Sequence, residues 1–178
     1  VMEIRKKNKE TNAILDGAVM EYSELAAKIQ DLHIFFSLLI PDMSHEEKQL
    51  LDEALVLTYQ QKGITHENES LIDPENPEQY KEMPVLGDVY NELIRRQETK
   101  RLANILNRLV HGSASSFNQQ TNVDLKNKYI VLDISELTGD LLPVGMFVAV
   151  DYVWSKVKED RTEKKMVFLD EVWQLIGA

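Results

Sequence analysis

Apolar side chains recur at helical spacing over the first two thirds of the chain. The first stripe follows Tyr22 at steps of three and four residues, and it consists of Leu25, Ile29, Leu32, Phe36 and Leu39. This spacing puts the apolar positions on one face of an amphipathic helix. Pro41 follows the stripe and is expected to end that helix.

A second helix is predicted directly after Pro41. Ser44 and Glu47 have the spacing of a capping box, in which Ser44 is the N-cap and Glu47 reaches back to it. The apolar side of this helix consists of Leu50, Leu51, Ala54, Leu55 and Thr58. Gly63 is a plausible stop. The two helices are expected to form an antiparallel hairpin with a short turn.

Residues 65–83 contain two prolines and several acids but few apolar side chains, which predicts an exposed loop. Pro84 then stands where the first residue of a helix tolerates proline. Apolar stripes at residues 86–94 and 102–109 predict a third and a fourth helix, which can be continuous with each other. We therefore expect residues 22–111 to form an all-helical subdomain, with residues 1–21 leading into it.

The pattern changes after His111, and residues 112–178 are predicted to be α/β. The run from Tyr129 to Ile134 is apolar on both faces, as in a strand buried within a parallel sheet. Residues 141–158 have a helical stripe that includes Trp154, which we expect to pack, and residues 166–169 form a second apolar run. Strand, helix and strand in this order predict a right-handed βαβ unit.

Two adjacent acids, Asp170 and Glu171, follow the second apolar run. Ligands of open parallel sheets bind beyond the carboxyl ends of the strands, and four apolar residues followed by Asp-Glu have the form of a Walker B motif. In that role Asp170 holds Mg²⁺, directly or through water, and Glu171 is the general base for the attacking water. The simpler alternative is a strand whose terminal acid caps the next helix. Asp133 ends the other predicted strand, and a local turn with Ser135 is favoured over a place in the same crevice.

Charge and composition narrow the function further. The net charge is −10, so we expect no direct binding of nucleic acid by this chain. The basic residues Arg95, Arg96, Lys100 and Arg101 are interpreted as solvated helix faces. The chain has no cysteine, which excludes a disulfide framework and a thiolate metal site.

The sequence lacks a Gly-x-x-x-x-Gly-Lys-Ser/Thr loop. Without that loop there is no cradle for the β- and γ-phosphates of a nucleotide. We therefore predict that the chain by itself neither binds ATP tightly nor hydrolyses it.

Residues 164–175, KKMVFLDEVWQL, resemble the Walker B segment of the VirB-four-type ATPases of type IV secretion and conjugative transfer systems. The stretches at 117–118, 123–125 and 128–137 are similar to the segment that precedes Walker B in that family. The resemblance implies a RecA-like P-loop NTPase sheet, present here in part, with an all-helical insertion between Walker A and Walker B. The resemblance is specific from about residue 117 to 175 and architectural before that.

The resemblance also implies a role for the longer protein of which this chain would be an internal fragment. That protein would be a bacterial ATPase that uses ATP and Mg²⁺ and carries its phosphate loop before Val1. It would lie in the cytoplasm at the inner face of the membrane, as an oligomer that is often hexameric, together with other type IV secretion components. Only Asp170, as nucleotide and metal ligand, and Glu171, as catalytic base, can be carried over from the family motif.

Two other functions remain open from the sequence. One is a catalytically idle helical module for protein–protein contacts. The other is a related DNA-translocating P-loop ATPase, such as a coupling protein, since the Walker B segment separates these classes poorly.

Overall fold

The computed structural model groups the chain into two compact units, which are described separately here. The helical unit comprises Val1–Ile4 and Glu21–Asn122, and the second unit comprises Arg5–Met20 and Val123–Ala178. The residues that the structure describes are 1–2, 4, 14–15, 18–19, 23–122, 127, 129–137, 139–159 and 162–170.

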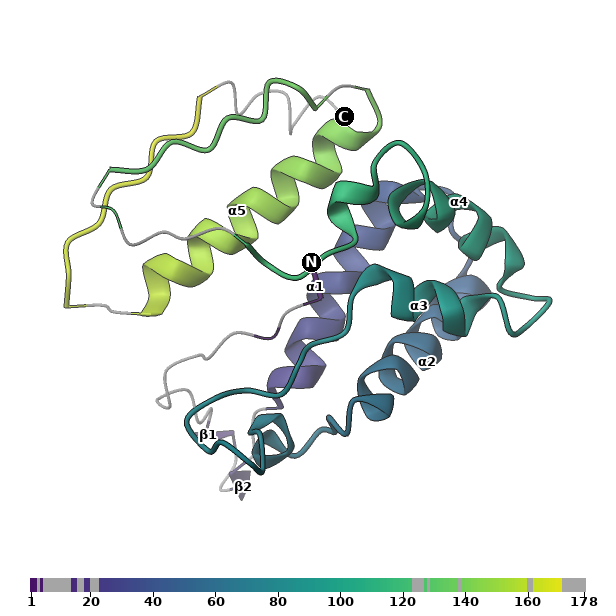
Figure 1. The fold of residues 1–178 in the computed structure, drawn as a ribbon, viewed down its shortest axis with the longest axis horizontal. Helices are drawn as coiled ribbons and strands as arrows, with labels where there is room; N and C mark the ends of the chain where they lie inside the picture. Colours follow the sequence, from purple (N-terminus) through teal and green to yellow (C-terminus); the bar gives the residue numbers. More distant parts are fainter. Residues whose placement is uncertain are drawn as a thin grey trace. The chain divides into compact units, whose positions relative to one another are not determined.

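The predicted helical hairpin is present. Helix α1 (Glu24–Leu39) begins at the N-cap Ser23, whose side chain accepts a hydrogen bond from the backbone N–H of Ala26. Helix α2 (His45–Gln61) follows after a short turn and packs against α1 (Figure 1). Its capping box is confirmed, because the Glu47 N–H donates to Ser44 Oγ at 3.1 Å and the Ser44 N–H donates to Glu47 Oε2 at 2.9 Å.

The stretch after α2 is a loop, but its backbone is well organised. Gly63 has φ +70° and turns the chain out of α2, a conformation that glycine adopts without a steric cost. The 3₁₀ turn η1 (Asn68–Leu71) follows. An isolated antiparallel bridge then joins Ile72 to Tyr80. Leu71 is buried, so the loop has an apolar anchor of its own.

The third helical stretch differs from the prediction at its start, and its relation to the fourth helix, which the sequence left open, is now decided. Helix α3 (Leu86–Leu93) begins two residues after Pro84, with Val85 as N-cap, because the Asp88 carboxylate accepts the Val85 N–H at 2.8 Å. Helix α4 (Lys100–Val110) is separate from α3 rather than continuous with it. The buried Thr99 lies between them and donates its hydroxyl to the carbonyl of Leu93, which satisfies a carbonyl at the end of α3.

The core of the helical unit consists of the inner faces of four helices. Helix α3 packs on α2, and α4 packs on α3 (Figure 1). The bulky fully buried side chains include Phe35 and Phe36 of α1 and Tyr59 of α2. Met2 and Ile4 belong to this core as well, with 2% and 3% exposure. The sequence pattern did not predict that, because two apolar residues in a polar lead-in carry no periodic signal.

The second unit contains the long helix α5 (Leu141–Glu159) and a small hairpin of two-residue strands. Strands β1 (Ile14–Leu15) and β2 (Ala18–Val19) pair antiparallel, with Ile14 opposite Val19. Helix α5 confirms the predicted helix over residues 141–158. Trp154 on α5 is 55% exposed, with Lys158 Nζ 5.2 Å from its ring centroid, so the expectation that it packs in a core was wrong.

The two apolar runs of the second unit do not form sheet strands in the described part of the chain. Residues 129–134 and 164–169 lie outside any helix or strand ladder. Most of their side chains are exposed, for example Tyr129 at 85% and Phe168 at 84%, and Ile134 is half-buried. The expectation that these runs are buried is therefore wrong for this chain, and the parallel sheet itself stays a prediction. The physical reason is that an extended segment buries its faces only when other strands and helices cover them.

Candidate functional site

The sequence places the candidate nucleotide site at the end of the second apolar run. The structure describes this run up to Asp170, whose side chain is exposed. Glu171 lies outside the described residues. Four apolar side chains precede Asp170, and all of them are exposed: Met166 at 78%, Val167 at 44%, Phe168 at 84% and Leu169 at 55%.

The order and direction of the neighbouring elements are those of a crossover. Residues 129–137, α5 and residues 164–170 follow one another, and Figure 1 shows the two extended segments running in the same direction while α5 runs back. Gly145 of α5 is a position of close approach, since a Cβ there would lie 2.1 Å from Leu137 Cδ1. The first extended segment thus ends against α5, where a larger residue would push Leu137 away.

Asp133 has a local role. Its Oδ1 accepts a hydrogen bond from the Ser135 backbone N–H at 2.9 Å. This backbone hydrogen bond, together with one from the Ser135 side chain, holds the pKa of Asp133 below its usual value. The favoured interpretation, a turn cap with Ser135, is confirmed.

The carboxylates of the described residues do not assemble into a complete metal site. No group of three or more His, Cys, Asp or Glu among them is placed to hold a metal ion. Mg²⁺ at nucleotide sites is bound by one or two carboxylates together with phosphate oxygens and water. An exposed Asp170 at the end of an extended segment fits one such ligand, with the other ligands coming from nucleotide and water.

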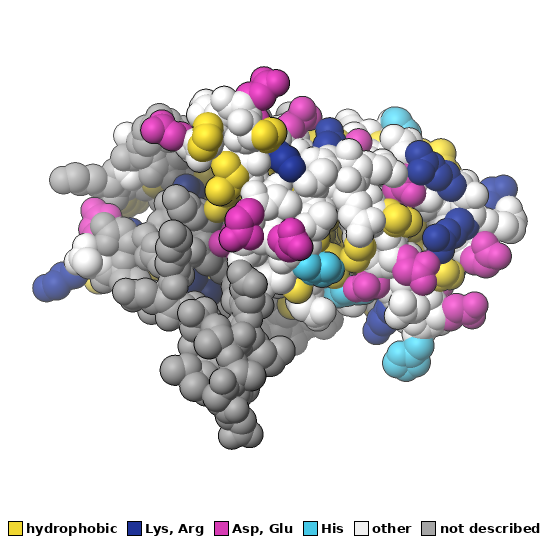
Figure 2. Space-filling view, turned by 90° about the horizontal axis from the view of Figure 1, so that it is seen from below, with side chains coloured by type: hydrophobic (Ala, Val, Ile, Leu, Met, Phe, Trp, Pro, Cys, Tyr) yellow, Lys and Arg dark blue, Asp and Glu magenta, His cyan; other side chains and the backbone are white. Residues whose placement is uncertain are grey.

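The basic cluster near α3 and α4 is largely committed to ion pairs. Arg101 binds two carboxylates, Asp42 at 2.6 Å and Glu47 at 2.9 Å, and Arg96 binds Glu53 at 2.7 Å. Acidic and basic side chains accordingly lie next to one another on the face shown in Figure 2. The sequence analysis interpreted this cluster as solvated faces and missed its partners, because they come from the α1–α2 hairpin, 43 to 59 residues away.

None of the helices that the structure describes is long and apolar enough to cross a bilayer. This finding concerns the described residues alone.

The chain was compared with family models, curated proteins and solved structures. No protein-family model matches the sequence, and no curated protein does either. Among solved structures, the chain is similar to VirB4 of Thermoanaerobacter pseudethanolicus, with a TM-score of 0.76 and 28% sequence identity. The match covers 90% of this chain and 62% of the VirB4 chain, so this chain spans less than two thirds of that protein.

The likeness extends over both units rather than over one of them, because 90% of the chain cannot be covered by either unit alone. Both the helical unit and residues of the second unit therefore belong to the part of the chain that resembles VirB4. In fold and in sequence, the chain is thus similar to a VirB4-type polypeptide.

Proposed function

We propose that this chain is part of a motor ATPase that powers type IV secretion and conjugative transfer. The observation that carries the proposal is the match to VirB4 over 90% of the chain at a TM-score of 0.76. The acidic pair at 170–171 supports it, because four apolar residues followed by Asp-Glu have the form of a Walker B motif. In the whole protein, ATP hydrolysis would drive assembly of the transfer apparatus and passage of DNA or protein.

In the proposed site, Asp170 is a ligand of the nucleotide-bound cation, and Glu171 acts on water. Mg²⁺ bound to the nucleotide neutralises charge that develops on the phosphates. In the whole protein, Asp170 would bind through its carboxylate at the end of a strand paired with its neighbours, which positions a ligand better than a loop does. Glu171 orients the attacking water and takes its proton as general base.

The proposed domain organisation is the one that the sequence resemblance implies. Residues 1–21 would lead from the phosphate-binding part, residues 22–111 would be the helical insertion, and residues 112–178 would contribute to the RecA-like core. The whole protein would work as an oligomer, often a hexamer, with other type IV secretion components at the inner face of the membrane. The helical insertion would offer a surface for such partners.

The test of the proposed site is Glu171→Gln in a longer polypeptide that also contains a phosphate-binding loop. Loss of a general base slows a reaction about 10²- to 10⁴-fold, so turnover should fall by at least about a hundredfold. Nucleotide binding should stay within about threefold, because Gln keeps the size and polarity of Glu and the charge of Asp170 remains. ATP turnover and equilibrium nucleotide binding are the two measurements.

Glu163→Gln is the matched control. Glu163 is an exposed acid of the same segment and pairs with Lys165 at 3.8 Å. This variant should keep full turnover. Undiminished turnover in Glu171→Gln would show that Glu171 is not the base, and turnover by the 178-residue chain alone would contradict the need for a separate phosphate loop.

A further inference from the structure

The chain passes between its two units three times. The helical unit contains Val1–Ile4 and Glu21–Asn122, so the passages follow Ile4, Met20 and Asn122. A simple insertion needs only two passages. The short first stretch adds a third, and it raises the question of how the three passages are held on the helical unit.

The first passage is held by α2 and by the loop of residues 65–83, here called the loop. Met2 is 2% exposed, and its carbonyl accepts a hydrogen bond from the hydroxyl of Tyr59, a buried residue near the end of α2. Ile4 is 3% exposed and lines a pocket together with Tyr80 and Met83 of the loop.

The second passage is held by the beginning of the loop. The Glu24 backbone N–H, at the start of α1, donates to Asn68 Oδ1 at 2.9 Å. Ser23 Oγ lies 3.2 Å from His66 Nδ1 in a second hydrogen bond.

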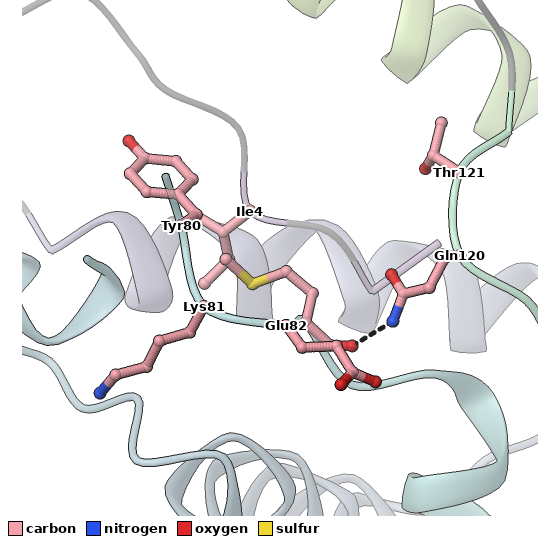
Figure 3. A pocket seen from close by; sticks show the side chains of 7 residues that line it. Ile4, Tyr80, Lys81, Glu82, Gln120 and Thr121 are labelled. Carbon is pink, nitrogen blue, oxygen red and sulfur yellow. Dashed lines mark hydrogen bonds between the residues drawn. The ribbon is translucent and has the colours of Figure 1, made fainter. Parts of the chain in front are cut away.

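The third passage is held by the end of the loop. Gln120 Nε2 donates to the carbonyl of Met83 at 2.5 Å. Gln120 and Thr121 line the same pocket of about 350 Å³ as Ile4 and Tyr80 (Figure 3). The residues before the first passage and those before the third therefore meet at one place.

The loop is rigid enough to hold these segments, because its own backbone is paired. The Asp73 N–H donates to the Gln79 carbonyl and the Lys81 N–H donates to the Leu71 carbonyl, both at 2.9 Å. Lys81 Nζ also donates to the Gly63 carbonyl at 2.6 Å, which ties the loop back to the end of α2. Side chains and backbone of one loop thus contact all three passages.

We propose that the loop of residues 65–83 is a clamp that couples the three passages between the units. Loosening one passage from the loop loosens the other two, although they are far apart in sequence. This coupling is independent of the proposed ATPase function, and it is testable in the 178-residue chain itself.

The test is hydrogen–deuterium exchange of the chain carrying Asn68→Ala, which removes the acceptor of the Glu24 N–H. Exchange at residues 23–26 should rise about three- to tenfold, the effect expected from losing one hydrogen bond. Exchange at residues 1–4 and 118–122 should rise by at least about twofold. Exchange within α4 should stay unchanged, which separates coupling from a general loss of stability.

Asn76→Ala is the matched control, because Asn76 is an exposed residue of the same loop whose side chain accepts only a long 3.4 Å bond from the Glu78 N–H. This variant should leave hydrogen–deuterium exchange at residues 1–4, 23–26 and 118–122 unchanged. A rise confined to residues 23–26, or an equal rise in α4, would overturn the clamp. If Asn68→Ala does not fold, Gln120→Ala gives the reciprocal test, with faster exchange expected at residues 23–26 and an unchanged value there contradicting the proposal.

Discussion

Two phenylalanines in apolar runs have opposite environments in this chain. Phe36 of α1 is fully buried in the helical unit, whereas Phe168 of the second unit is 84% exposed. Both belong to stretches that the sequence predicts to be buried. The difference is in where the covering residues come from.

Helices α1 to α4 bury their apolar faces against neighbours that are close in sequence. An amphipathic helix satisfies its own backbone and needs only one apolar partner face, which the next helix provides. A parallel strand needs hydrogen-bonding partners on both edges and cover on both faces, and these come from distant parts of a chain. Residues 130–134 and 164–169 have the composition of such strands but are not covered by the described residues.

The largest expected effect tests this comparison directly. Phe36→Ala should lower the free energy of unfolding of the helical unit by about 3–5 kcal/mol, because it leaves a cavity in a closed core. Phe168→Ala should change the free energy of unfolding by less than about 0.5 kcal/mol, because the Phe168 side chain buries little apolar area in the folded chain. Denaturant unfolding followed by circular dichroism measures both variants.

The same pair also sharpens the proposed function. In a longer polypeptide in which neighbouring strands cover residues 164–169, Phe168→Ala should become costly. A large cost already in the 178-residue chain would contradict the exposed environment, and a small cost in the longer polypeptide would contradict the predicted inner strand.

A middle-sized effect is expected at the capping box of α2. Ser44→Ala removes the acceptor of the Glu47 N–H and should destabilise the helical unit by about 1 kcal/mol. Ser116→Ala changes an exposed serine in the 3₁₀ turn η2 (Ser115–Phe117) and serves as the control. Equal unfolding curves for Ser44→Ala and the unaltered chain would show that the N-terminus of α2 does not depend on this cap.

The smallest effect is a pH dependence confined to the helical unit. The Ser44 backbone N–H, followed by Arg101, lowers the pKa of Glu47 from its ordinary value of 4.5. A carboxylate with a lowered folded pKa adds stability above pH 4.5, and this stability is lost as the pH falls through the folded pKa. Unfolding at pH 7, 5, 4 and 3 should therefore show a smaller acid-induced loss for Glu47→Gln than for the unaltered chain.

Gln retains the capping geometry, so this variant isolates the charge of Glu47. Glu46→Gln removes one charge from the same helical turn and is the control. An acid-induced loss as steep in Glu47→Gln as in the unaltered chain would mean that the carboxylate contributes nothing to the pH dependence.

The predictable part of the fold consists of elements with a strong local signal. The α1–α2 hairpin, its capping box and the turn at Asp133 all follow from residues within a few positions of one another. The break between α3 and α4 and the N-cap of α3 were not predicted. They depend on the Thr99 hydroxyl reaching Leu93 and on Asp88 accepting the Val85 N–H, which compete with a plain helical pattern.

The acidic pair after an apolar run is readable from the sequence alone, and its role as a nucleotide site stays a prediction. Whether that run is buried was not predictable, because burial depends on the residues that pack against a segment and not on the segment itself. The contacts of the three passages with the loop could not be predicted from the sequence either, since residues 1–4, 23–24 and 120–121 share no sequence pattern.

By itself, the sequence determined which segments are helical, where the main caps lie and which two acids follow an apolar run. Only the tertiary structure decided which apolar residues are buried and which basic residues are paired. It also decided that a polar loop contacts three distant segments. Helical periodicity and capping are properties of neighbouring residues, whereas burial and ion pairing depend on parts of the chain that fold together from a distance.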